Sequence, residues 1–164
     1  MDYRGCFFCK FKTRENFMKK ETKWQPETKK YYYVASNNQQ DCELAISKAI
    51  TIATSTDKKI TLLIDNDDYK LVFEDNKAIH DIVRAAKLNK NNSISCIYRG
   101  CSFNLFISDA EQSEIYNTVL VYGATCGDAM RNAYESCAQN IILIPTCIAE
   151  WEFFTKAMNP ILIN

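Results

Sequence analysis

Residues 119–144 read VLVYGATCGDAMRNAYESCAQNIILI, and this stretch decides the fold class. An apolar run, Val119–Tyr122, leads through a small polar turn into Asp128–Gln139, and a second apolar run, Ile141–Ile144, follows. Within the middle segment four side chains recur at helical spacing and are predicted to face the core: Ala129, Met130, Ala133 and Cys137. The pattern predicts a strand, a helix and a strand. A further helix, from about Ala149 to Met158, should end before Pro160.

The preceding half continues this alternation. Tyr31–Ala35 is a β-prone run, and the next segment carries one apolar stripe at a period of 3.6 residues, formed by Cys42, Ala45, Ile46, Ala49, Ile50 and Ala53. Ile60–Ile64 is a continuous apolar run, as in strands that are buried on both faces. A second amphipathic helix is marked by Ile79, Ile82, Val83 and Ala86.

Three shorter patterns complete the expected structure. The four turn formers Asp65–Asp68 separate Ile60–Ile64 from Tyr69–Phe73, which predicts a hairpin. Ser93–Tyr98 and Phe103–Ile107 flank Arg99–Ser102 as a second strand, turn and strand. Ser108 and Glu111 have capping-box spacing and predict a short helix through Tyr116.

Strands that alternate with helices favour a largely parallel sheet covered on both faces. We therefore expect one α/β domain over residues 1–164, a three-layer Rossmann-like or flavodoxin-like sandwich with a mixed, mainly parallel sheet. The length of 164 residues, with 47% hydrophobic and 24% charged residues, suits one globular core. No apolar run approaches the roughly 20 residues that cross a bilayer, and the first residues have no signal-peptide pattern. We expect a cytoplasmic protein with no membrane partner and with mostly reduced cysteines.

Residues 1–30 form a basic, aromatic arm. They hold nine Lys/Arg against four Asp/Glu, a net charge of +5 that leaves −5 for the remainder. A nucleic-acid partner is one explanation, but a charge of +5 without a long basic run is a weak signature of one. We expect instead that the arm docks on the body through Phe7, Phe8, Phe11, Phe17 and Trp24.

The turn after the strand Val119–Tyr122 is the main candidate for a ligand site, made of Gly123, Ala124, Thr125, Cys126, Gly127 and Asp128. Small residues let a ligand approach the backbone, and the start of a helix favours a phosphate or carboxylate. The sequence thus predicts a binding module for a small anionic ligand, a nucleotide or phosphorylated metabolite. The turn matches neither the dinucleotide fingerprint nor the P-loop, so a turn capped by Thr125 and Asp128 alone is the alternative.

Two further candidates concern catalysis. Cys126 would lie in the first helical turn, where a thiolate is favoured, but the only histidine, His80, lies on another helix. Asp65 and Asp67 resemble the strand-end D-x-D of haloacid-dehalogenase-like phosphatases, which implies a metal-dependent phosphohydrolase. Tyr69 and Pro145-Thr146 depart from that family, and an acidic hairpin turn is the simpler interpretation. No catalytic residue or cofactor is assigned.

The last candidates concern metal and partners. Cys6 and Cys9 have zinc-knuckle spacing without a second pair of ligands, so no metal site is expected. The aromatic residues Trp151, Phe153 and Phe154 are more than one helix face can hide. They either pack in the core against the aromatic N-terminal arm or form a homodimer interface, which leaves an interaction protein without a small-molecule site as a third functional hypothesis.

Overall fold

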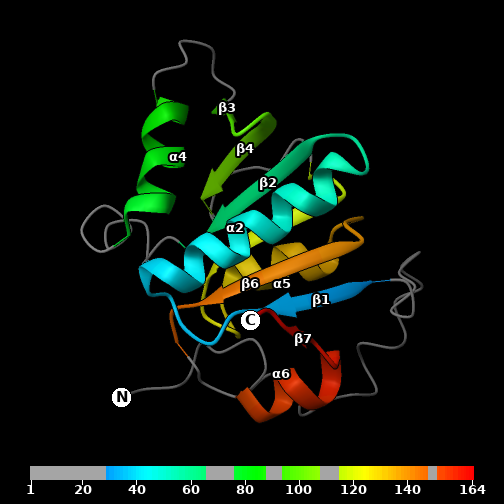
Figure 1. Ribbon diagram of the computed structural model, residues 1–164. Helices are drawn as coiled ribbons and strands as arrows, with labels where there is room; N and C mark the ends of the chain where they lie inside the picture. Colours follow the sequence, from blue (N-terminus) through cyan, green and yellow to red (C-terminus); the bar gives the residue numbers. More distant parts are fainter. Residues whose placement is uncertain (1–28, 66–75, 88–93, 108–114, 148–150) are drawn as a thin grey trace.

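The computed structural model describes residues 29–65, 76–87, 94–107, 115–147 and 151–164 (Figure 1). Within these residues seven strands form one sheet in the order β3-β4-β2-β5-β6-β1-β7. The strands are β1 (Lys30–Tyr33), β2 (Lys59–Ile64), β3 (Ser95–Tyr98), β4 (Cys101–Ile107), β5 (Thr118–Gly123), β6 (Asn140–Pro145) and β7 (Ile161–Leu162). The helices are α2 (Gln39–Thr54), α4 (Lys77–Lys87), α5 (Asp128–Glu135) and α6 (Trp151–Met158).

All neighbouring strands pair in parallel except β3 and β4, which are antiparallel. Helices α2 and α4 lie on one face of this sheet, and α5 lies behind it (Figure 1). The predicted α/β sandwich with a mixed, mainly parallel sheet is therefore confirmed. None of the helices in the described parts of the chain is both long and apolar enough to span a membrane.

The central strand β2 explains why its sequence is a continuous apolar run. Leu62 packs in the core on the side of α2 and α4, whereas Leu63 packs in the core on the side of α5 and α6. Side chains alternate along a strand, so a strand covered on both faces needs apolar residues at successive positions. The stripe of α2 is also as predicted, because Cys42, Ala45, Ile46, Ala49 and Ala53 are buried.

Helix α5 is shorter than predicted, because it ends at Glu135 and not at Gln139. Ser136 has extended backbone angles, and its Oγ donates to the carbonyl of Ala133 at 2.6 Å and accepts from the amide of Ala138 at 3.1 Å. Serine side chains compete in this way with the backbone bonds that would continue a helix. The prediction that Cys137 faces the core is wrong for the same reason, and Cys137 is exposed.

The two predicted hairpins have different outcomes. The hairpin of β3 and β4 is confirmed, with a turn of Arg99 (φ 47°) and Gly100 (φ 79°) between the paired residues Tyr98 and Cys101. The first hairpin is wrong, because both edges of β2 are taken by the parallel neighbours β4 and β5. Its second arm, Tyr69–Phe73, lies outside the described residues. Most of the short helix predicted after Ser108 lies outside them too, and residues 115 and 116 are not helical.

The direction of winding reverses between β2 and β5, which are neighbours in the sheet. From β2 the chain continues through α4 and reaches β4 on one side, whereas from β5 it continues through α5 and reaches β6 on the other. Helices α4 and α5 cover opposite faces. The segments that follow β2 and β5 therefore diverge at the carboxyl edge of the sheet, which is where open α/β sheets bind ligands.

Candidate functional site at the carboxyl edge of the sheet

The side chain of Asp65 lies in the predicted ligand loop. Asp65 directly follows β2, and its carboxylate accepts hydrogen bonds from two backbone amides of the neighbouring segment. Oδ2 accepts from the amide of Ala124 and Oδ1 from the amide of Ala129, each at 2.8 Å. The Asp65 side chain is buried, with 8% of the residue exposed. One amide of the predicted ligand loop, that of Ala124, and one amide of the first turn of α5, that of Ala129, thus hold an internal carboxylate.

Gly123 and Gly127 are the residues that make room for this carboxylate. A Cβ atom added to Gly123 would lie 2.2 Å from Asp65 Oδ2, and one added to Gly127 would lie 2.1 Å from the same oxygen. Backbone strain is not the reason for glycine at position 127, since its φ is −76°. The small residues were predicted to let a ligand approach the backbone, and it is the Asp65 carboxylate that makes this close approach.

Asp65 also caps helix α5. Gly127 is the N-cap residue of this helix and has no side chain to accept a bond from the first turn. The Asp65 carboxylate supplies this acceptor from another strand, at the Ala129 amide. A negative group at this position also lies at the positive end of the helix dipole. The cap therefore comes from Asp65, and Asp128 instead forms an ion pair with Arg131 at 2.7 Å.

The rest of the loop is a tight turn beside the segment that follows β6. The amide of Gly127 donates to the carbonyl of Ala124 at 3.0 Å, which places Thr125 and Cys126 at the corner of the turn. The amide of Thr125 donates to the carbonyl of Cys147 at 3.4 Å, and Thr125 is fully buried. The predicted residues Gly123–Asp128 thus form one compact unit held from two neighbouring strands.

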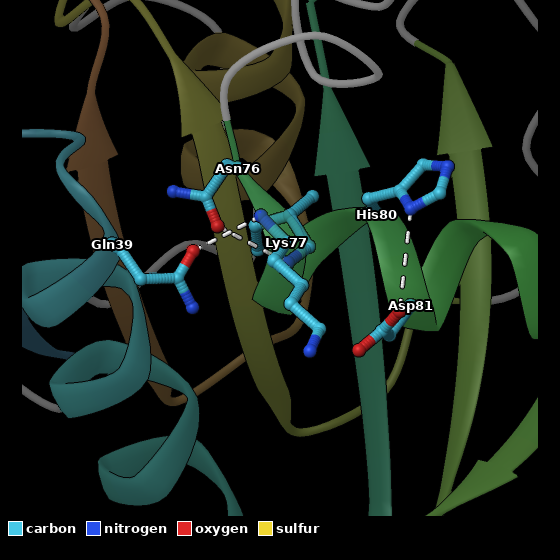
Figure 2. A network of polar contacts seen from close by, with 6 residues as sticks. Gln39, Asn76, Lys77, His80 and Asp81 are labelled. Carbon is cyan, nitrogen blue, oxygen red and sulfur yellow. Dashed lines mark hydrogen bonds and ion pairs between the residues drawn. The ribbon is translucent and has the colours of Figure 1, made fainter.

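A second polar network lies where α2 and α4 begin (Figure 2). Asn76 Oδ1 accepts from the amide of Ile79 at 3.3 Å, and Gln39 Oε1 accepts from the amide of Lys77 at 3.0 Å. Asn76 Nδ2 donates to the Cys42 sulfur at 2.8 Å. The bonds to Cys42 and Gln39 join the start of α4 to the first turn of α2, whereas the bond from Ile79 lies within the start of α4.

This network is connected to β5 through a neighbouring asparagine. Asn76 Nδ2 also donates to the carbonyl of Asn37 at 3.1 Å, and Asn37 Nδ2 donates to Tyr122 Oη at 3.4 Å. Sequence reasoning missed these contacts. Asn76 directly before a helical stripe is a cap signal that could have been found, but its long-range partners carry no sequence signal.

The carboxyl edge brings together the first turns of α2, α4 and α5, because each of these helices follows a parallel strand. The positive ends of their dipoles therefore point to the same edge, which favours negative groups there. His80 lies on α4, with Nδ1 4.0 Å from Asp81 Oδ1 (Figure 2), and Cys126 lies before α5 on the opposite face of the sheet.

The last sequence candidates to be placed are the possible metal ligands. Asp67, Cys6 and Cys9 lie outside the described residues, and so do residues 1–28 of the predicted arm 1–30. Among the residues that the structure describes, no group of three or more His, Cys, Asp or Glu side chains could hold a metal ion. Comparison of the chain with protein-family models, curated proteins and solved structures gave no match.

Proposed function

We propose that this protein is a binding module for a small anionic ligand, a nucleotide or a phosphorylated metabolite, anchored on the loop Gly123–Asp128. The observation that carries the proposal is the pair of 2.8 Å hydrogen bonds from the Ala124 and Ala129 amides to Asp65. Amides that hold two carboxylate oxygens in this way have the polarity and spacing that a phosphate needs.

In this proposal Asp65 is the internal occupant of the anion site, and the ligand takes its place. The space beside Gly123 and Gly127 accommodates a carboxylate oxygen, since a Cβ atom at either position would collide with it. The same space accepts a phosphate oxygen once the Asp65 side chain has turned away. The position between β2 and β5, where the winding reverses, also supports a ligand here.

The other hypotheses remain predictions. A metal-dependent phosphohydrolase needs a second carboxylate beside Asp65, and Asp67 is not among the described residues. The homodimeric interaction protein and the cytoplasmic location rest on sequence arguments alone. We prefer anion binding because two backbone amides of the loop and of α5 already bind a negatively charged group, the Asp65 carboxylate.

The test compares the wild type, Asp65→Ala and the control Asp81→Ala by thermal shift and calorimetry, with inorganic phosphate and ADP as probes. We expect millimolar anion to raise the melting temperature of the wild type, because a ligand that binds only the folded state stabilises it. Asp65→Ala should melt at a lower temperature without ligand and bind phosphate about tenfold more tightly or better, because the internal competitor is gone.

Asp81→Ala removes one carboxylate from the exposed surface of α4 and should bind phosphate like the wild type. Sodium chloride at equal ionic strength separates specific binding from salt effects. If Asp65→Ala does not fold, Asp65→Asn replaces it, since the amide retains only one oxygen acceptor. The proposal fails if neither the wild type nor the Asp65 variant binds phosphate or ADP at millimolar concentration.

A further inference from the structure

Strand β7 lies at one end of the sheet and exposes apolar side chains. It is the last strand in the sheet order, and its neighbour in the described part of the chain is β1 (Figure 1). Ile161 is 56% exposed and Leu162 is 41% exposed. Edge strands of natural proteins usually carry charged side chains or another device that prevents further pairing. An edge of uncharged, apolar residues is therefore a place where another segment of chain can bind.

The two exposed side chains of β7 belong to opposite faces of the sheet. Ile161 pairs with Tyr32, which packs in the core on the side of α2. Leu162 pairs with Tyr33, which packs on the side of α5 and α6. Apolar residues at successive positions are typical of a strand that is covered on both faces. Strand β7 thus has the sequence of an internal strand and the position of an edge strand.

The backbone of β7 also presents hydrogen-bonding groups to its outer side. The Ile163 amide donates to the carbonyl of Tyr33 at 2.8 Å, so the peptide groups of Ile163 face β1. Successive residues of a strand direct their N–H and C=O groups to alternate sides, so those of Leu162 point away from β1. Among the residues that the structure describes, no strand lies on that side. An extended segment placed there bonds to Leu162 and covers both exposed side chains.

The arm 1–30, of which residues 1–28 lie outside the described residues, leads directly into the strand beside β7. Lys30 begins β1, and its amide donates to the carbonyl of Gln139 at 2.7 Å, which fixes the end of the arm at the start of β1. The outer edge of β7 is two strand spacings, about 10 Å, from β1. Residues 12–28 span up to about 55 Å when extended, so the earlier part of the arm can reach this edge.

One run of the arm has the composition that this edge requires. Phe7–Phe11 reads FFCKF, and phenylalanine is enriched in strands. Side chains alternate along a strand, so Phe7 and Phe11 would share one face and Phe8 would lie on the other. The run therefore offers apolar side chains to both faces, as Ile161 and Leu162 do.

We propose that β7 is the docking surface of the arm, and that Phe7–Phe11 adds a strand to its outer edge. The phenylalanine rings cover Ile161 and Leu162, and the Leu162 backbone gains hydrogen-bond partners. This proposal does not depend on anion binding. The opposite edge strand, β3, exposes Ile97 to 73% but lies at the other end of the sheet from β1, so Ile97 serves as the matched control.

The first experiment measures hydrogen exchange of single amides in the ¹⁵N-labelled full chain by nuclear magnetic resonance. The comparison variant replaces Phe7, Phe8 and Phe11 with serine. We expect the Leu162 amide to exchange at least about tenfold more slowly in the wild type than in this variant, because a paired amide exchanges only when the structure opens. The Ile163 amide is the internal control and should stay protected in both proteins, since it donates to Tyr33.

Two outcomes of this experiment overturn the proposal. One is a Leu162 amide that exchanges in the wild type as fast as an unstructured amide. The other is protection of Leu162 that persists in the triple-serine variant, and a dimer in light scattering would then identify a second copy of the chain as the occupant.

The second experiment changes the body and leaves the arm intact. Ile161→Asp places a charge in the docking surface, and Ile97→Asp places the same charge at the opposite edge. Both side chains are exposed, so neither change disturbs the core. We expect trypsin to cleave after Lys10 about tenfold faster in Ile161→Asp than in the wild type, and at the wild-type rate in Ile97→Asp. Equal cleavage rates in all three proteins overturn the proposal.

Discussion

At the level of single residues, Asp65 connects three elements. Its amide donates to the carbonyl of Tyr122 at 3.1 Å, and its two carboxylate oxygens accept from Ala124 in the loop and from Ala129 in α5. A buried carboxylate that accepts backbone hydrogen bonds makes strong, charge-assisted contacts. Loss of this side chain leaves two amides without their acceptor, which should cost about 2 to 4 kcal/mol of unfolding free energy.

The first prediction is that Gly127 and Asp65 are energetically coupled. Gly127→Ala should lower the unfolding free energy by about 2 kcal/mol or more, because the new Cβ atom forces the Asp65 carboxylate out of its contacts. In the Asp65→Ala background the same change should cost much less, since φ of −76° suits alanine. Urea unfolding of the two single variants and the double variant measures this coupling.

Additive losses in this double-mutant cycle would contradict the account. They would mean that the cost of Gly127→Ala comes from the backbone at position 127 and not from a collision between the new Cβ atom and the Asp65 carboxylate. Asp81→Ala combined with Gly127→Ala is the matched control, and we expect its effects to add because Asp81 lies on the helix α4 that covers the other face.

The second prediction concerns Cys42 and alkaline pH. Burial raises the pKa of this thiol from 9.0 to about 12. Between these values the unfolded chain has lost the proton that the folded chain keeps, so stability falls as pH rises, by about 1.4 kcal/mol per pH unit for this group. Below about pH 9 its contribution is fully present.

Urea unfolding of the wild type and of Cys42→Ala between pH 8 and 11 tests this slope. Other buried groups titrate in the same direction, because burial also raises the pKa of Cys96 and Tyr134. The informative quantity is therefore the difference between the two proteins. The wild type should lose stability more steeply than the variant above pH 9, and parallel curves would contradict the prediction.

At the level of elements, α5 and α6 hold the second face of the sheet through few side chains. Helix α5 buries Ala129, Met130 and Ala133. Helix α6 buries Phe154 completely, and the Phe154 ring lies edge-on to Tyr33 of β1 with centroids 6.3 Å apart. Phe154 therefore packs in the core, whereas packing of the aromatic cluster against the N-terminal arm stays a prediction, because residues 1–28 lie outside the described residues.

The third prediction follows for α6. Phe154→Ala should lower the unfolding free energy by about 3 to 5 kcal/mol, because it removes a fully buried ring from the core. Phe154→Leu should cost less, since it keeps most of the apolar volume. A loss below about 1 kcal/mol for Phe154→Ala, measured by urea unfolding, would show that α6 contributes little to the core.

At the level of the whole molecule, the periodic segments determined what could be predicted. The apolar stripe of α2 shows a helix buried on one face, and the continuous apolar run of β2 shows a strand buried on both faces. Helix, strand and sandwich architecture could therefore be predicted from the sequence. The end of α5 was missed because the competing hydrogen bonds of Ser136 are a local choice that periodicity does not show. The first hairpin was missed because β4 and β5, which are distant in sequence, occupy both edges of β2.

The candidate site was predictable only in part. The turn Gly123–Asp128 could be found from its place between a strand and a helix, but Asp65 looked like a turn former or a metal ligand. The hydrogen bond that gives Asp65 its role joins residues 59 positions apart. Pairing at that distance is a property of the fold. The homodimer and the docked arm 1–30 stay predictions, which light scattering and deletion of the arm would test.

The most direct test of anion binding in the loop follows two backbone amides by nuclear magnetic resonance. Titration of the ¹⁵N-labelled wild type with inorganic phosphate should move the amide signals of Ala124 and Ala129 in a saturable way, because the phosphate replaces the Asp65 carboxylate as their acceptor. Equal ionic strength from sodium chloride should leave both signals in place. If these two amides do not respond to millimolar phosphate in the wild type or in Asp65→Ala, the loop is a structural cap and the account of its function is wrong.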